Sequence, residues 1–230
     1  MPDPLALYQS DKYLEVTGGT WDLHDAPFKA NEVRQMLSKH NIQPSSVCDI
    51  GCGAGGVLRE LQLALPKDVQ FTGYDVSPHA LEMGKDFVNE RYRMVLDDPF
   101  TDGKVYDVAL ALDVFEHVED CFGFLRHMKA KARHKIYHVP LEVHASAALR
   151  GVHAWPVGHL HQYTRETALK TIEHSDQQVL DWWYTGPADS ESIGMRTWLT
   201  HRVRKPIAAI AGKQFAARLL GGYSLLVLAK

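Results

Sequence analysis

Residues 47–56 read VCDIGCGAGG, in which an apolar strand end and an aspartate precede four glycines in six positions. Glycine loses more conformational entropy on folding than other residues, so this cluster indicates a backbone that a ligand or another segment approaches closely. Gly51, Gly53 and Gly56 match G-x-G-x-x-G between a predicted strand, 46–50, and a predicted helix, 54–65. The stretch therefore predicts a Rossmann-like site at a helix N-terminus.

Strands and helices alternate on both sides of this turn. Their short connections predict a parallel sheet covered by helices on both faces. The predicted strands are 46–50, 70–75, 92–96, 105–112, 135–141 (closed by Pro140), 177–186 and 222–230, and the predicted helices are 27–40, 54–65, 77–90 (capped by Ser77), 119–133, 164–175 (capped by Thr164) and 195–220 (interrupted at Pro206).

Composition limits the protein class. A chain of 230 residues that is 45% apolar can bury one substantial core, and its net charge of −3 gives no reason to expect nucleic-acid binding. Three unpaired cysteines indicate a reducing, cytoplasmic compartment. The start of the chain has acids where a signal peptide needs basic residues, and no apolar run is long enough for a membrane span, so we expect neither.

Charge is uneven along the chain. Residues 192–230 hold seven basic residues and no acid, which is typical of a partner surface or of a solvated helix face.

Dinucleotide-binding oxidoreductases use such a glycine turn, and so does at least one other class of enzyme. Asp75 ends the second predicted strand and suits a ribose diol in either class. Asp49, two residues before the first glycine, suits a positively charged ligand and would repel a pyrophosphate. An acid-rich segment, LALDVFEHVED at 110–120, follows the fourth strand, and about forty-five residues precede the first strand. These three features argue against a nicotinamide-dependent oxidoreductase.

The stretches VCDIGCGAGG, FTGYDVSPHALEMGK, MVLDDPF and YDVALALDVFEHV together resemble the class I S-adenosylmethionine-dependent methyltransferases. The resemblance implies a seven-stranded, mostly parallel, doubly wound α/β sheet whose last strand is inserted antiparallel. We divide this single domain, 1–230, into an N-terminal arm (1–44), a cofactor-binding core (45–142) and an acceptor-side segment (143–230). GGTWDLHDAPFKA, HVPLE and VGHLHQYT look like a group of bacterial small-molecule methyltransferases.

The resemblance also implies which residues bind S-adenosylmethionine and its product S-adenosylhomocysteine. Asp49 and the backbone of Gly51, Cys52 and Gly53 would hold the amino-acid end. The backbone at 112–113, Leu112 and Asp113, would lie beside the methionine amine.

The residues at the next two strand ends would bind the nucleoside end of the cofactor. Asp75 would accept hydrogen bonds from the ribose hydroxyls and Val76 would pack on adenine. Asp97 or Asp98 would meet the adenine amino group.

The acceptor is expected to be a small molecule, with a hydroxyl group of a sugar or natural product favoured because histidines suit proton removal. His117 is the first candidate base, with Glu116 either its partner or a solvated carboxylate. Six further histidines lie within 28 residues, and among them His159 and His161 are candidate catalytic groups. These histidines could line the acceptor pocket, bind a metal or simply pack, and we assign no metal. Amine and carbon acceptors and a non-catalytic cofactor-binding module stay open, and the oligomeric state is not predicted.

Overall fold

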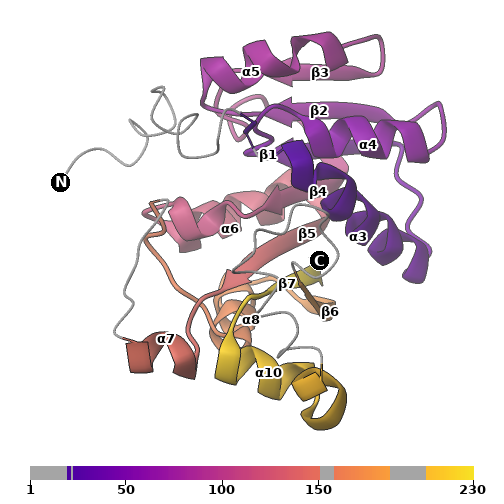
Figure 1. Cartoon of the computed structure of the whole chain (residues 1–230). Helices are drawn as coiled ribbons and strands as arrows, with labels where there is room; N and C mark the ends of the chain where they lie inside the picture. The colour runs from indigo at the N-terminus through magenta and orange to yellow at the C-terminus, as the bar shows by residue number, and fades with distance from the viewer. Residues whose placement is uncertain (1–19, 22, 151–157, 187–205) are drawn as a thin grey trace.

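The computed structural model describes residues 20–21, 23–150, 158–186 and 206–230. Their strands form one seven-stranded sheet in the order β3-β2-β1-β4-β5-β7-β6 (Figure 1). Strands β1 to β5 run parallel, and β7 lies antiparallel between β5 and β6. The predicted fold class, including the inserted last strand, is confirmed. The strands are β1 (Ser46–Ile50), β2 (Gln70–Tyr74), β3 (Tyr92–Val95), β4 (Tyr106–Leu112), β5 (Ala132–Leu141), β6 (Val179–Thr185) and β7 (Tyr223–Ala229).

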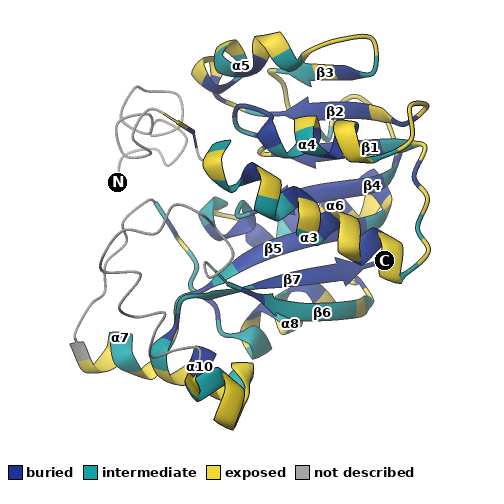
Figure 2. Ribbon diagram, turned by 45° about the vertical axis from the view of Figure 1, so that its right-hand side comes forward, coloured by how far each residue is buried: buried dark blue, intermediate teal, exposed yellow. Residues whose placement is uncertain are grey.

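Helices cover both faces of the sheet, because successive side chains of a central strand point to opposite faces. In β4, Val108 and Leu110 pack in one cluster with α3 (Ala26–Lys39) and α4 (Gly56–Ala64). The alternate residues of β4, at 109 and 111, pack in the other cluster, with α6 (Cys121–Lys131) and α8 (Arg165–Glu173). Figure 2 shows the resulting layers, with buried strands between helices whose outer surfaces are exposed.

Two predicted helix caps are confirmed. The Ser77 side chain accepts a hydrogen bond from the backbone of Ala80 at the start of α5 (Pro78–Gly84), and Thr164 forms a capping box with Thr167. The remaining short elements are η1 (Leu23–Asp25), η2 (Lys85–Phe87), η3 (Phe115–His117), α7 (Ala145–Arg150) and α10 (Lys213–Leu220).

Two predicted boundaries were wrong. Strand β5 begins at Ala132 and continues through Pro140, which lies opposite Ser224 in the antiparallel ladder. The helix predicted at 77–90 ends as an α-helix at Gly84 and continues only as the 3₁₀ turn η2. Of the segment 195–220, residues 195–205 lie outside the described residues. The predicted interruption at Pro206 therefore stays a prediction, and the described part has a further break at Gly212, whose φ of +87° is left-handed.

The described residues also show the character of the helices, the cysteines and the C-terminal basic residues. Among the described helices, none combines the length and apolar character that a bilayer span requires. All three cysteines are buried and free. Four of the seven C-terminal basic residues lie outside the described part of the chain, and the other three, Lys213, Arg218 and Lys230, are exposed.

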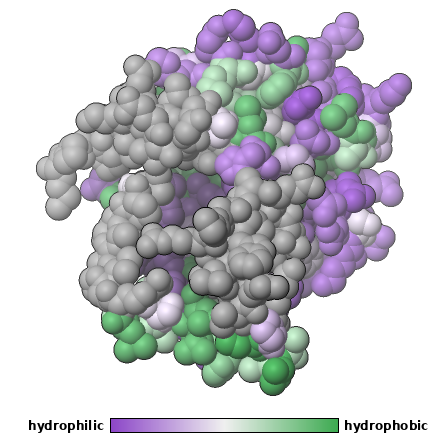
Figure 3. Space-filling view, viewed as in Figure 1, coloured by the Kyte–Doolittle hydropathy of each residue, from purple (hydrophilic) through white to green (hydrophobic). Residues whose placement is uncertain are grey.

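Exposed apolar side chains gather at the edge of the molecule formed by α7 and α10 (Figure 3). They include Leu149, Ile210 and Phe215.

The division of the domain at residues 44 and 142 stays a prediction.

Candidate active site

A cavity of about 600 Å³ lies at the carboxyl ends of β1, β2, β3 and β4. Strands β1 and β4 are neighbours there, and the chain continues from them to opposite sides of the sheet. Ligands of open α/β sheets bind at such a switch point, and the volume is within the ~300–1,000 Å³ of small-molecule sites. The residues predicted to bind the cofactor all line this cavity: Asp49, Gly51, Cys52, Gly53, Asp75, Val76, Asp97, Asp98, Leu112 and Asp113.

The backbone of the glycine turn is held from the end of the second strand. The N–H groups of Gly51 and Cys52 both donate to the Tyr74 carbonyl, at 2.8 and 3.0 Å. The N–H of Gly53 donates to Asp75 Oδ2 at 2.7 Å. Because these three donors already have partners, the turn is better suited to meet a positively charged group than an anion.

Glycine is required in this turn by the protein itself. Gly51 and Gly53 have φ of +75° and +55°. A Cβ on Gly51 would lie 2.7 Å from Val114 Cγ2, and one on Gly53 would lie 3.1 Å from Trp21 Cδ1. Trp21 also lines the cavity, whereas Tyr8 and Tyr13, which precede it, lie outside the described residues. The glycines therefore serve the fold at the same place where they border the cavity.

Asp49 is a buried acid at the cavity wall. It is 2% exposed, and its Oδ1 has no hydrogen-bond partner among the described residues. Burial raises its pKa to about 7, an effect that Lys29 opposes and the charge of Asp75 increases. A buried acceptor beside a cavity fits the ammonium group of an amino acid.

Three further acids follow β2 and β3. Both oxygens of Asp75 accept backbone N–H groups, from Gly53 at 2.7 Å and from Ser77 at 2.8 Å, and burial raises its pKa. Asp97 accepts the N–H of Asp98 at 2.8 Å, and Asp98 accepts the N–H of Phe100 at 2.9 Å. Each carboxylate is thus fixed in place with lone pairs left for a ligand.

Asp113, at the end of β4, is held in a strained conformation. Its φ is +58°, which is uncommon for a residue other than glycine and costs on the order of 1–3 kcal/mol. Lys29 Nζ and His138 Nδ1 contact its two oxygens at 2.8 and 2.7 Å. Burial alone would raise its pKa, but His138 and Lys29 hold it well below the ordinary value. Sequence reasoning missed Lys29, because nothing in helix 27–40 indicates that it faces this loop.

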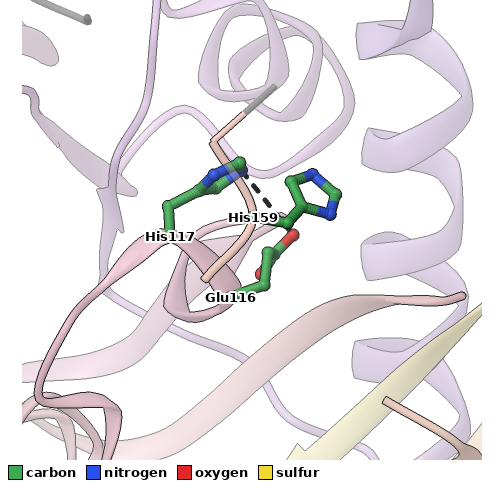
Figure 4. A group of neighbouring side chains, drawn as sticks. All are labelled: Glu116, His117 and His159. Carbon is green, nitrogen blue, oxygen red and sulfur yellow. Dashed lines mark ion pairs between the residues drawn. The ribbon is translucent and has the colours of Figure 1, made fainter. Parts of the chain in front are cut away.

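A cluster of Glu116, His117 and His159 lies beside the cavity, which His117 lines (Figure 4). The Glu116 carbonyl accepts the backbone N–H groups of Leu160 and His161, at 2.8 and 3.0 Å. This pairing of distant segments brings His117 and His159 together, with a distance of 4.5 Å between their ring centroids. His159 Nδ1 bonds to Glu142 Oε2 at 2.8 Å, a contact that the sequence did not indicate.

Burial governs the electrostatics of this cluster. Burial raises the pKa of Glu116 well above its ordinary value, and the charge of Asp113 adds to the effect. Burial, followed by the neighbouring His159, lowers the pKa of His117 to about 4. His117 is therefore a neutral imidazole near pH 7. Glu116 is fully buried, so the alternative that it is a solvated carboxylate was wrong.

The other histidines are dispersed. His161 Nε2 bonds to the Val118 carbonyl at 2.9 Å and fastens the loop rather than facing His117. His138 bonds to Asp113 and Thr185, and His144 caps the start of α7. His153 lies outside the described residues. The structure thus brings together only His117 and His159 of the three predicted catalytic histidines.

Comparison with known proteins identifies the family. Residues 23–202 match the family model described as "Methyltransferase domain". The chain is 30% identical over 95 residues to ajmaline N-methyltransferase of Rauvolfia serpentina. The matched stretch covers 37% of this chain and 32% of the relative. It is 32% identical over 115 residues to the ubiquinone biosynthesis O-methyltransferase of Azorhizobium caulinodans, which covers 44% of each chain. The chain therefore spans less than half the length of these relatives.

The fold has matches among solved structures. One is magnesium protoporphyrin IX methyltransferase from Synechocystis PCC 6803 with bound S-adenosylhomocysteine, at a TM-score of 0.60 and 17% identity. The match covers 88% of this chain and 82% of that chain.

Proposed function

This chain belongs to the S-adenosylmethionine-dependent methyltransferase family, and from that premise we propose that it methylates a hydroxyl group of a small molecule, such as a sugar or natural-product metabolite. The observation that carries the proposal is that one cavity holds both the acids at the strand ends and, beside them, His117. A cofactor and an acceptor bound there together would meet inside a single enclosure.

The chain's own residues fit the amino-acid end of the cofactor. Asp49 Oδ1, buried and without a partner among the described residues, accepts the methionine ammonium. The backbone of Gly51, Cys52 and Gly53 borders the same place, where their N–H groups are already used and carbonyl oxygens suit a cation. The backbone at 112–113 closes the opposite side of the cavity.

Three strand-end positions fit the nucleoside. Asp75 accepts the ribose hydroxyls with the lone pairs that Gly53 and Ser77 leave. Val76, which is 41% exposed at the cavity wall, packs on adenine. Asp97 or Asp98 accepts the adenine amino group.

His117 and His159 act at the acceptor end. When bound, S-adenosylmethionine supplies a methyl group on a positively charged sulfur. Transfer of that methyl group to the acceptor oxygen would leave S-adenosylhomocysteine, and the hydroxyl proton would have to pass to a base, for which His117 is the candidate. A neutral imidazole at His117 can take part in activating that hydroxyl, and Glu142 orients the ring of His159 behind it. We leave His161 out of this role, because its ring is engaged by backbone carbonyls.

Amine methylation is the second candidate. One relative is named as an N-methyltransferase and another as an O-methyltransferase, so family membership does not choose between them. The paired imidazoles favour a hydroxyl, because a neutral amine can attack without prior loss of a proton.

The proposal is tested in two steps. Calorimetry should show that S-adenosylhomocysteine binds and that NAD does not. A metabolite extract incubated with labelled methyl donor should then yield a labelled product, whose linkage is determined by mass spectrometry and NMR. His117→Gln should keep the affinity for S-adenosylhomocysteine and lower turnover by about 100-fold or more.

The matched control is His174→Gln, which alters an exposed histidine at the end of α8. It should leave both affinity and turnover unchanged. Binding without labelled product from any extract would instead support a non-catalytic module, and a methylated nitrogen would refute the hydroxyl assignment.

A further inference from the structure

Glu116, His117 and His159 each offer one potential metal-ligand atom, and these three atoms all lie within 4.8 Å of one another (Figure 4). Metal bonds of about 2.0–2.2 Å allow two ligand atoms to be at most about 4.4 Å apart, so the side chains would have to rotate to close the set. Two imidazoles and one carboxylate are typical of Zn²⁺, Fe²⁺, Mn²⁺ or Co²⁺ sites. We propose that this cluster binds one divalent transition-metal ion beside the acceptor end of the cavity.

The side chain of Glu116 is the strongest support. It is 0% exposed, and neither carboxylate oxygen has a hydrogen-bond partner in the part of the chain that the structure describes. Its closest cationic candidate, His117 Nε2, is 4.0 Å from Oε1, which is too far for a hydrogen bond. Buried carboxylates without compensation are costly, and coordination to a cation supplies the missing compensation.

His159 already has the outer contact that a metal-bound histidine needs. Ligating histidines almost always donate their second ring nitrogen to a carboxylate or carbonyl, which fixes the tautomer and the ring orientation. Glu142 Oε2 accepts from Nδ1 of His159 at 2.8 Å, so Nε2 is the nitrogen that can bind a cation without breaking this bond.

The main chain holds the two ligand segments together. The backbone carbonyl of Glu116 accepts N–H groups from Leu160 and His161, immediately after His159. The separation between η3 and residues 158–161 is thus set by two hydrogen bonds rather than by the side chains alone. A site fixed in this way loses less entropy when a cation binds.

The position of the site suggests its use. His117 borders the cavity, whereas Glu116 and His159 are not among the lining residues, so with a cation bound His117 would be a metal ligand at the cavity wall instead of the base. A cation there lowers the pKa of a coordinated hydroxyl and fixes its direction. The inferred acceptor class is therefore a small molecule with a hydroxyl oxygen able to coordinate a metal. This role rests on the proposed function, whereas binding of the cation does not.

The test measures metal directly. The full chain, stripped with a chelator, is dialysed separately against Zn²⁺, Mn²⁺ and Co²⁺, and the bound metal is counted per chain by elemental analysis. One equivalent of at least one ion is expected, and Co²⁺ should give the visible absorption of a nitrogen–oxygen site. Glu116→Gln should weaken binding by at least about 100-fold, and Glu142→Gln, which changes only the outer contact, by about 10–100-fold.

The matched control is Glu119→Gln, which removes an exposed carboxylate of the same loop and should leave the metal affinity unchanged. Affinity for S-adenosylhomocysteine, measured on every variant, verifies that the fold and cofactor site are intact. No metal bound by the unsubstituted chain, or equal binding by Glu116→Gln, would overturn the inference. Methyl transfer that continues in excess chelator would overturn the metal's role in catalysis and leave the proposed function standing. If the unsubstituted chain binds one equivalent of metal but no S-adenosylhomocysteine, the proposed function and the metal's role in it are overturned, and the metal site stands.

Discussion

Replacing Asp75 by asparagine tests the assignment of the cofactor site. The carboxylate lines the cavity and is fixed by backbone N–H groups at 2.7 and 2.8 Å, so its position does not depend on a ligand. Asparagine keeps the shape and one acceptor oxygen but removes the charge and places an amide NH₂ where the second acceptor was. We expect weaker binding of S-adenosylhomocysteine with the overall fold retained.

The magnitude follows from the hydrogen bonds at risk. Hydrogen bonds to a charged group contribute about 1.5–3 kcal/mol. Loss of that amount raises the dissociation constant about 10- to 150-fold, since each 1.4 kcal/mol is a factor of ten. Isothermal titration calorimetry measures the change directly.

Asp107→Asn is the matched control. Asp107 Oδ2 accepts the backbone N–H groups of Ser45 and Ser46, at 2.9 and 3.1 Å. Like Asp75, it therefore holds a backbone segment through its carboxylate. Asp107 does not line the cavity. Both variants should unfold at lower temperature, but only Asp75→Asn should lose affinity. Equal affinities for S-adenosylhomocysteine in the two variants would refute the ribose assignment.

Three further predictions address the turn, the buried acid and a helix cap. Gly53→Val should abolish binding of S-adenosylhomocysteine while circular dichroism stays near that of the unsubstituted chain, because φ is +55° and Trp21 lies 3.1 Å from the new Cβ; normal binding would contradict this. Asp49 has its pKa raised from 3.8 to about 7, so its ionisation destabilises the fold increasingly as pH rises between these values. The melting temperature of Asp49→Asn relative to the unsubstituted chain should therefore rise from pH 4 to pH 7 and level off above, and a difference independent of pH would count against the shift. Thr164→Ala should cost about 1 kcal/mol of unfolding free energy in urea titrations, and an unchanged value would mean that the cap of α8 is dispensable.

Local patterns were enough to predict the sheet and the gathering of the strand-end acids at one edge of it. The glycine turn after 46–50 and the repeated strand–helix units depend on turn chemistry and periodicity, which act over a few residues. Asp49, Asp75 and Asp97 each end a strand, and parallel strands bring their carboxyl ends to one edge. Their shared position around the cavity therefore follows from the order of elements.

Tertiary structure decided the contacts between distant segments. Lys29 reaches Asp113 because α3 packs across the end of β4, and no local pattern in that helix encodes the contact. The sequence did not indicate which of the histidines from 134 to 161 would meet His117. Chain folding separated them by placing His138 on Asp113 and His161 on the Val118 carbonyl.

The meeting of His117 and His159 has the same origin. It depends on two backbone hydrogen bonds to the Glu116 carbonyl from residues far away along the chain. Residue types and their order along the chain determined which groups could do chemistry. Long-range packing decided which of them share a site, because the distance between two side chains far apart in sequence is set by the elements that carry them.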